Sequence, residues 1–164
     1  MPTIRAYAEA DWPQVERIMQ DGINTGQATF DTKPKAKHVW EGESIAETQL
    51  VAVEGNKVCG WVLLWPTSNR CAYAGVAEVS IYVAAETAGR GIGKALLRAV
   101  IVASEEVGIW SIQSGIFKEN EGSIALHLSC GFRYIGYRER IGKHNGVWRD
   151  TQQYERRSEI ISID

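Results

Sequence analysis

Apolar residues along this 164-residue chain follow two spacings in turn, one typical of strands and one typical of helices. Runs rich in β-branched and aromatic residues predict strands over residues 3–7, 50–54, 57–65, 77–83, 110–117, 132–141 and 147–154. Apolar residues three and four apart predict helices over 12–23, 92–107 and 123–130, and a less regular one over 35–48. This order predicts a mixed α/β sheet with helices on both faces.

Single glycines, prolines and capping residues mark the expected ends of these elements. Asp11 is expected to cap the first helix, and Gly42 interrupts the weaker second one. Gly55-Asn56 predicts a hairpin turn. Gly108 is expected to end the helix 92–107. No repeat, low-complexity tract or linker separates these elements, so residues 1–164 are expected to form one domain.

The overall charge narrows the classes of partner. The formal net charge is −2 and the isoelectric point is about 6.0, which gives no general attraction to nucleic acid or to an anionic membrane. The first residues lack the apolar run of a secretory signal, and no run approaches the roughly 18 residues of a membrane span. We therefore expect a cytoplasmic protein that binds small molecules, with no nucleic-acid or membrane partner.

The cysteines indicate neither a disulfide framework nor a metal site. They are three in number, widely spaced and without a CxxC pair: Cys59, Cys71 and Cys130. Such residues usually act as small apolar side chains. No metal is expected.

A cluster of three glycines lies between the strand 77–83 and the helix 92–107. Gly89, Gly91 and Gly93 let the backbone curl so that N–H groups point outward at a helix N-terminus, an arrangement that binds phosphate. Arg90 and Lys94 add positive charge beside it. The alternative is a tight turn that uses glycine for steric reasons alone.

Two nucleotide-binding motifs do not fit this cluster. The triphosphatase loop G-x-x-x-x-G-K-[ST] needs a longer spacing and a hydroxyl residue where Ala95 stands. The dinucleotide fingerprint G-x-G-x-x-G needs a small residue where Lys94 or Leu96 stands.

The segment from Ala88 to Gly93 resembles the pyrophosphate loop Q/R-x-x-G-x-G/A of the GNAT superfamily of N-acetyltransferases, with Ala88 in place of the usual Gln or Arg. Asn120 and the helix that leads to Gly131-Phe132 match a second motif of that family. The resemblance implies the GNAT fold, a mixed central sheet of about six to seven strands splayed between two central strands. It also implies that acetyl-CoA contacts Ile81, Tyr82, Val83, Gly89, Arg90, Gly91, Ile92, Gly93, Lys94, Asn120 and Ser123.

Transfer of an acetyl group to an amine needs a base, because most amines are protonated at pH 7. Glu78 begins the strand that leads to the glycine turn, and the resemblance assigns it this role; the alternative is a carboxylate in solvent. A backbone N–H between Ile81 and Val83 is expected to stabilise the oxyanion. His127 stands where related enzymes place the donor to the leaving thiolate, although a packed core histidine is the alternative.

Four segments resemble phosphinothricin acetyltransferases and the related methionine sulfone or sulfoximine acetyltransferases: QATF at 27–30, RCAY at 70–73, AEVSIYV at 77–83 and GKHNGVWRD at 142–150. This subfamily implies an amino acid analogue as the amine. Arg70, Tyr73 and Lys143 would donate to its oxygens and Phe30 would cover its stem. Val76, Ala77 and Glu78 are further expected substrate contacts, whereas core or surface roles are the alternative for Phe30, Arg70, Lys143 and Trp148. The subfamily also implies a homodimer in which the final hairpin helps to build the neighbour's pocket.

Two other functions stay open on the sequence. One is a GNAT enzyme for another amine, such as an aminoglycoside, a polyamine or a protein N-terminus. The other is a non-catalytic sensor of acetyl-CoA, although such a protein needs neither Glu78 nor His127.

Overall fold

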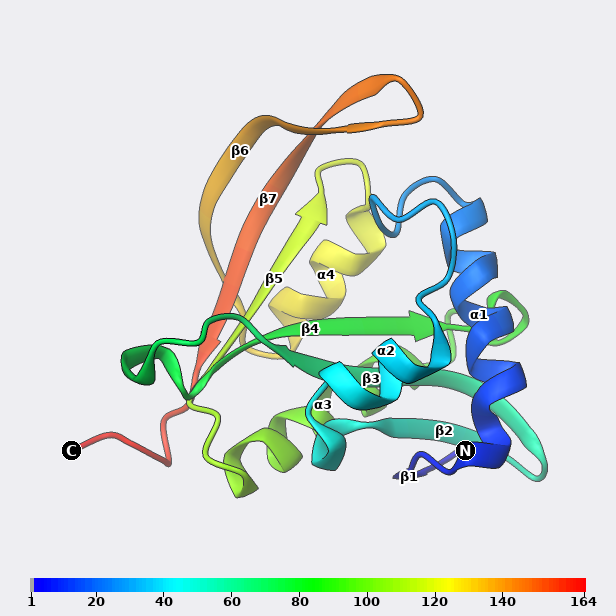
Figure 1. Cartoon of the computed structure of the whole chain (residues 1–164), viewed down its shortest axis with the longest axis horizontal. Helices are drawn as coiled ribbons and strands as arrows, with labels where there is room; N and C mark the ends of the chain where they lie inside the picture. Colours follow the sequence, from blue (N-terminus) through cyan, green and yellow to red (C-terminus); the bar gives the residue numbers. More distant parts are fainter. Residues whose placement is uncertain (1) are drawn as a thin grey trace.

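The computed structural model describes residues 2–164 and contains one seven-stranded sheet in the order β1-β2-β3-β4-β5-β7-β6 (Figure 1). The strands are β1 (Thr3–Ala6), β2 (Leu50–Glu54), β3 (Lys57–Pro66), β4 (Val76–Val83), β5 (Ser111–Phe117), β6 (Arg133–His144) and β7 (Val147–Arg157). The helices are α1 (Trp12–Asn24), α2 (Lys37–Glu43), α3 (Ile92–Glu106) and α4 (Glu121–Ser129). The predicted order of strands and helices and the mixed α/β class are confirmed.

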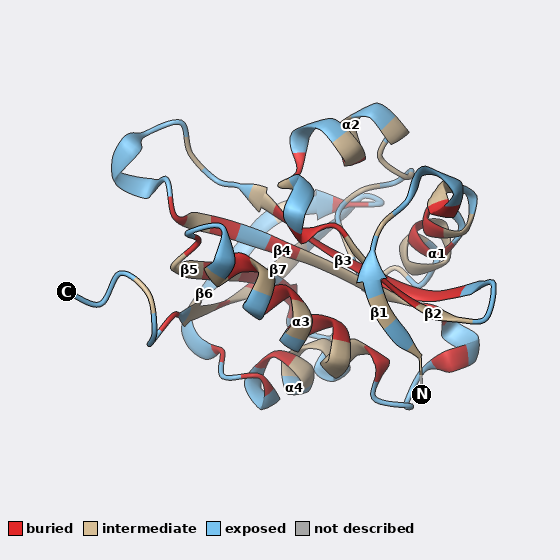
Figure 2. Ribbon diagram, turned by 90° about the horizontal axis from the view of Figure 1, so that it is seen from below, coloured by how far each residue is buried: buried red, intermediate tan, exposed pale blue. Residues whose placement is uncertain are grey.

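Helices cover both faces of the sheet, and each face has its own buried core (Figure 2). On one face α1 and α2 pack through Val15, Ile18, Met19 and Trp40 against Trp61 and Leu63 of β3. On the other face α3 packs through Ile92, Leu96, Leu97 and Val100 against Val62 and Leu64. Because side chains alternate along a strand, consecutive residues of β3 serve opposite cores.

The sheet divides between its two central strands. β4 and β5 are its one parallel pair, and they are paired only from Val76 to Glu78 against Ser111 to Gln113. Beyond Glu78 the strands diverge, and β5 rises with the β6–β7 hairpin away from β4 (Figure 1). The predicted splay is confirmed, and it leaves the second half of β4 unpaired on one side.

Two local expectations are wrong. Asp11 does not cap α1: its carboxylate accepts the N–H of Ala8 at 2.8 Å and forms an ion pair with Arg5 at 2.7 Å, so it fixes the chain before the helix instead. The second helix ends at Glu43, one residue after Gly42, and a separate 3-10 turn follows at Ala46–Thr48. Glycine at this position shortens the helix, as its low propensity explains. None of the described helices is long and apolar enough to cross a membrane.

Candidate active site

Side chains of β4 alternate between the two faces of the sheet at the point where the strands separate. Glu78, Ser80 and Tyr82 lie on the face covered by α1 and α2, where Tyr82 stacks on Trp61 with ring centres 4.8 Å apart. Val79 and the other odd-numbered residues lie on the face covered by α3 and α4. β4 therefore presents polar side chains to one face only.

The backbone of β4 also has a defined direction. Leu64 of β3 donates its N–H to Thr48 Oγ1 at 3.0 Å and accepts from the N–H of Ile45 at 2.9 Å, so its backbone groups point away from β4. Because these directions alternate, Val79, which pairs with Leu64, and then Ile81 and Val83 turn their N–H and C=O groups toward β5. Where β5 has diverged, these groups face open space.

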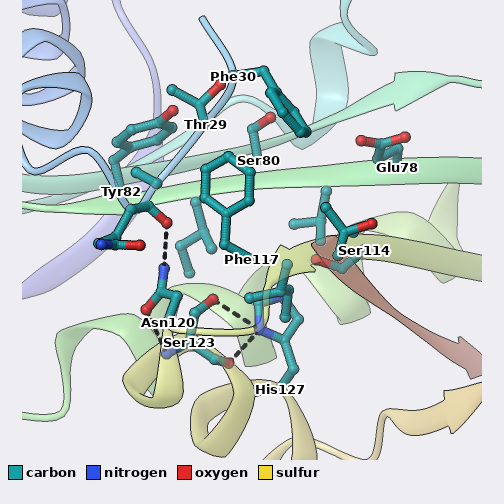
Figure 3. A pocket seen from close by; sticks show the side chains of 17 residues that line it. Thr29, Phe30, Glu78, Ser80, Tyr82, Ser114, Phe117, Asn120, Ser123 and His127 are labelled. Carbon is teal, nitrogen blue, oxygen red and sulfur yellow. Dashed lines mark hydrogen bonds between the residues drawn. The ribbon is translucent and has the colours of Figure 1, made fainter. Parts of the chain in front are cut away.

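A cavity of about 210 Å³ fills this space (Figure 3). Its walls come from the chain before α2, from β4, β5 and β7, and from α4 with its N-cap: Gln27, Ala28, Thr29, Phe30, Glu78, Val79, Ser80, Ile81, Tyr82, Ser114, Gly115, Ile116, Phe117, Asn120, Ser123, His127 and Thr151. We call it the splay cavity. It brings together seven of the predicted site residues: Phe30, Glu78, Ile81, Tyr82, Asn120, Ser123 and His127.

A second cavity, of about 530 Å³, lies on the α1–α2 face, and we call it the outer cavity. It is lined by Met19, Thr29, Asp31, Lys35, Val39, Glu43, Trp61, Trp65, Pro66, Thr67, Glu78, Ser80, Tyr82 and Gln113. Thr29, Glu78, Ser80 and Tyr82 line both cavities. One molecule can thus approach from each side and meet the other at Glu78.

The Glu78 carboxyl is exposed toward these cavities, yet the protein around it removes enough water to raise its pKa above the ordinary value. A hydrogen bond from Gln113 and the charges of Arg138 and Lys35 oppose this effect. A carboxylate with a raised pKa is a stronger base than a free one. The position and the pKa both suit proton removal from an amine.

His127 is buried, and its contacts decide where its proton lies. Nδ1 is 2.7 Å from the carbonyl oxygen of Ser123, which can only accept, so Nδ1 carries the hydrogen. Nε2 is buried without a hydrogen-bond partner among the described residues. Burial lowers the pKa of His127, so the neutral ring presents Nε2 as an acceptor.

The glycine turn has the conformation that phosphate binding requires. Gly89 and Gly91 have φ of 78° and 80°, in the left-handed region that favours glycine. Gly91 is the N-cap of α3. The first helical hydrogen bond runs from the N–H of Ala95 to the Gly91 carbonyl at 3.1 Å. The N–H groups of Ile92, Gly93 and Lys94 precede that bond and are available to an anion.

Gly93 and Arg90 have more local roles than the sequence predicts. A Cβ at Gly93 would lie 3.2 Å from the Leu126 side chain, so this glycine allows α4 to pack closely against α3. The Arg90 guanidinium forms an ion pair with Glu54 at 2.6 Å, which turns it toward β2.

The segment Gln27–Phe30, which lines the splay cavity, is held from two sides. Asn120 caps α4 by accepting the Ser123 N–H at 3.2 Å and donates to the Gln27 carbonyl at 3.1 Å. Arg149 of β7 donates to the Gly26 carbonyl at 2.9 Å and to Gln27 Oε1 at 2.7 Å.

Arg149 is itself oriented by two rings. Its guanidinium lies 3.9 Å from the centre of the Phe117 ring and 3.2 Å from Nδ1 of the buried His144. Because arginine only donates, Nδ1 of His144 is the acceptor. Sequence reasoning assigned Arg149 no role, and only its place in the GKHNGVWRD segment pointed to it.

The other predicted substrate residues lie away from both cavities. Arg70 and Tyr73 are exposed and contact each other, with the guanidinium 5.4 Å from the ring centre. Lys143 lies near Trp148 on the exposed β6–β7 hairpin, at 5.6 Å from the ring centre. Val76 and Ala77 lie in the paired part of β4. Within one chain Arg70, Tyr73 and Lys143 line neither cavity, and neither do Val76 and Ala77 beside Glu78, so contact of all five with substrate stays a prediction.

Comparison with known proteins places the chain in a family. The acetyltransferase (GNAT) family matches residues 11–132. The chain belongs to the GNAT acetyltransferase family. It is therefore an enzyme that transfers an acyl group, and acetyl-CoA is the donor that this family uses.

Three similar proteins carry related names. A Streptomyces griseus N-acetyltransferase is 34% identical over 94% of this chain and 86% of its own length. A phosphinothricin N-acetyltransferase of Streptomyces coelicolor is 27% identical over 93% and 94%. A Sinorhizobium meliloti phosphinothricin acetyltransferase, solved in complex with AcCoA, has a TM-score of 0.85 at 28% identity over 95% of this chain and 88% of that one.

The described residues of this GNAT enzyme fit acetyl-CoA. The open backbone of β4 can pair with the amide groups of the pantetheine arm, and the N-terminus of α3 can bind its phosphates. The described residues hold no group of three or more His, Cys, Asp or Glu side chains suited to a metal ion.

Proposed function

We propose that this enzyme acetylates the α-amine of a small amino acid analogue of the phosphinothricin, methionine sulfone or methionine sulfoximine type. The observation that carries the proposal is the meeting of two cavities at Glu78, one along the open edge of β4 and one on the α1–α2 face. The donor then enters through the splay and the amine through the outer cavity. Direct attack of the amine needs no acyl-enzyme intermediate.

Glu78 is the proposed base. Its carboxylate takes the proton of the ammonium group, directly or through water, and releases it to solvent through the cavity. The N–H groups of Ile81 and Val83, which point into the splay, are the proposed donors to the oxyanion that forms on the acetyl carbonyl. They are fixed by the pairing of β4 with β3, so they need no rearrangement when charge develops.

His127 is the proposed group at the leaving thiol. Since its hydrogen is on Nδ1, Nε2 must receive a proton before it can give one. After attack the amine nitrogen carries a surplus proton, and Nε2 can take it and pass it to the departing sulfur. The histidine then acts as a relay and returns to its neutral form.

The names of the relatives support an amino acid analogue as the acceptor. Proteins named phosphinothricin N-acetyltransferase and L-methionine sulfoximine/L-methionine sulfone acetyltransferase are each similar over 90% or more of this chain. The outer cavity has a matching character, because aromatic rings of Trp61, Trp65 and Tyr82 adjoin charged and hydroxyl side chains. An apolar stem and a polar head can both be accommodated there.

We further propose a homodimer formed through the β6–β7 hairpin. Large apolar side chains are exposed along it, among them Tyr134, Tyr137, Ile141, Val147 and Trp148, and β6 is an edge strand. A second copy that covers this surface would bring its own Lys143 and Trp148 to a neighbouring site. Sedimentation of the purified protein tests this, since a monomer at micromolar concentration would contradict it.

One assay tests the activity. The protein is incubated with acetyl-CoA and a panel of amines while release of free thiol is followed. Turnover of methionine sulfone or phosphinothricin, with little turnover of peptides, polyamines or aminoglycosides, is the expected result. Preference for a peptide, a polyamine or an aminoglycoside would show that the enzyme acts on a different class of acceptor. Tight binding of acetyl-CoA without turnover of any amine would favour a sensor.

A further inference from the structure

One positively charged side chain, that of Lys35, lies among the residues that line the two cavities. Among all the residues that line them, Lys35 is the single lysine or arginine, and burial lowers the pKa of His127, which favours its neutral form. An amine without further charge needs no such group. An α-amino acid carries a carboxylate two bonds from its amine. A positively charged or hydrogen-bonding group must therefore bind this carboxylate in the same pocket as the base.

The sheet register brings Lys35 close to Glu78. Trp65 of β3 is paired directly with Glu78 of β4, so their side chains lie side by side on the α1–α2 face. The Trp65 ring is fixed by a hydrogen bond from its Nε1 to Ser80 Oγ at 2.9 Å. The Lys35 ammonium lies over this ring, 5.4 Å from its centre. Its charge is close enough to Glu78 to lower the pKa of that carboxyl.

Lys35 forms an ion pair with Asp31 that does not occupy its whole ammonium group. Its Nζ is 3.4 Å from Asp31 Oδ2, longer than a strong charged hydrogen bond, and the side chain remains partly exposed. Asp31 lies in the same cavity and is itself fixed, because its N–H donates to Thr29 Oγ1 at 3.0 Å. The ammonium thus has donors left for an incoming anion.

We propose that Lys35 binds the α-carboxylate of the acceptor and so selects α-amino acids over simple amines. This proposal rests on the proposed acetylation of an amino acid analogue. It moves the carboxylate contact from Arg70 and Lys143, which lie away from the cavities, to the segment before α2. Lys35 is then a specificity-determining residue, and its loss would act on the base only by raising the pKa of Glu78, for acid and amide acceptors alike.

The test compares two substrates that differ only in the carboxylate. Methionine sulfone and its α-carboxamide are assayed with wild-type protein, Lys35→Met and Lys35→Arg, and Lys33→Met serves as the matched control because Lys33 lines neither cavity. We expect Lys35→Met to lower kcat/KM for the acid by about ten- to a hundredfold and to change that for the amide much less, through the pKa of Glu78 alone. Lys35→Arg should restore most of the loss. The two amines differ in basicity, so the quantity compared between variants is the ratio of kcat/KM for the acid to kcat/KM for the amide, in which this difference cancels.

Three outcomes would overturn the assignment. Equal losses for acid and amide would show a general effect on the pocket, and wild-type kcat/KM for both substrates would place the carboxylate contact elsewhere. If Arg138→Met instead lost kcat/KM selectively for the acid, the carboxylate contact would belong to β6, because the charge of Arg138 also lowers the pKa of Glu78. Each of these leaves the proposed function intact if the wild type acetylates methionine sulfone. If the wild type acetylates no α-amino acid but accepts other amines, the proposed function fails and the Lys35 proposal fails with it.

Discussion

The proposed coenzyme side and the proposed acceptor side of this enzyme use different kinds of binding group. On the proposed coenzyme side the binding groups would be backbone N–H and C=O groups, exposed by two left-handed glycines and by a strand that lacks a neighbour beyond Glu78. On the proposed acceptor side they would be side chains from the 25–36 segment, β3 and β5 that line the outer cavity around Glu78. The coenzyme side suits a constant ligand, and the acceptor side can change its ligand by substitution without a change in fold.

The largest expected effect lies where the two sides meet. Glu78→Gln keeps the shape of the carboxylate but cannot accept a proton, so kcat should fall by about 10²- to 10⁴-fold at neutral pH. The loss should shrink at high pH, where more of the amine is already free. Because burial raises the pKa of Glu78, activity of the wild type should fall on the acid side at a pH above the ordinary glutamate value of about 4.5.

Steady-state rates across pH check this, with Glu106→Gln, an exposed carboxylate at the end of α3, as the control. A Glu78→Gln variant with wild-type kcat would remove Glu78 from the role of base.

A change in the glycine turn should affect the coenzyme alone. Gly91 has φ of 80°, and a side chain in this conformation costs about 1–2 kcal/mol. Gly91→Val should therefore weaken binding of acetyl-CoA by about tenfold, while KM for the amine at saturating acetyl-CoA stays near the wild-type value. Titration calorimetry with acetyl-CoA measures the first quantity.

Gly42→Ala is the matched control for this prediction. Gly42 lies in a helix with open space around it and without a positive φ, so alanine should stabilise the protein by about 0.5–1 kcal/mol. Equal losses of affinity for both substrates in Gly91→Val would contradict a separate coenzyme side.

A smaller effect is expected from the residue that holds the 26–30 segment. Arg149→Lys keeps the charge but loses the fork that reaches both the Gly26 carbonyl and Gln27 Oε1. We expect KM for the amine to rise severalfold with little change in kcat, and hydrogen exchange at residues 26–30 to become faster. Arg133→Lys, on an exposed ion pair with Glu155, is the control. Unchanged exchange at 26–30 would show that the segment is held by Asn120 alone.

The smallest effect concerns stability and the buried histidine. Burial lowers the pKa of His127 in the folded state, so the unfolded chain binds a proton more readily in the window below pH 6.5. The free energy of unfolding should therefore fall as the pH falls through this window, with a slope from this residue of at most about 1.4 kcal/mol per pH unit.

Denaturant titrations at several pH values should show a shallower slope in His127→Gln than in the wild type. His38→Gln, at an exposed position of α2, is the comparison. Parallel slopes in His127→Gln and the wild type would contradict a neutral buried ring.

The sequence predicts the glycine turn far better than the outer cavity, for a physical reason. Strand, glycine turn and helix follow one another between Val76 and Glu106, so local patterns contain the whole proposed phosphate site. The outer cavity joins residues whose proximity depends on strand register, such as Trp65 with Glu78, and on a loop that folds back over them. Lys35 and Arg149 therefore look like surface charges in the sequence. The proton on Nδ1 of His127 depends on one contact with a helix carbonyl and has no signature at all.

The early end of pairing between β4 and β5 has a consequence for the lifetime of the protein. Beyond Glu78 the sheet contains an internal edge whose hydrogen bonds acetyl-CoA would complete if it binds there as proposed. A ligand present at 100 times its Kd stabilises the folded state by about 2.7 kcal/mol. Resistance of this enzyme to unfolding and proteolysis should therefore follow the supply of acetyl-CoA, so that a cell short of the acetyl donor would also retain less of the enzyme that consumes it.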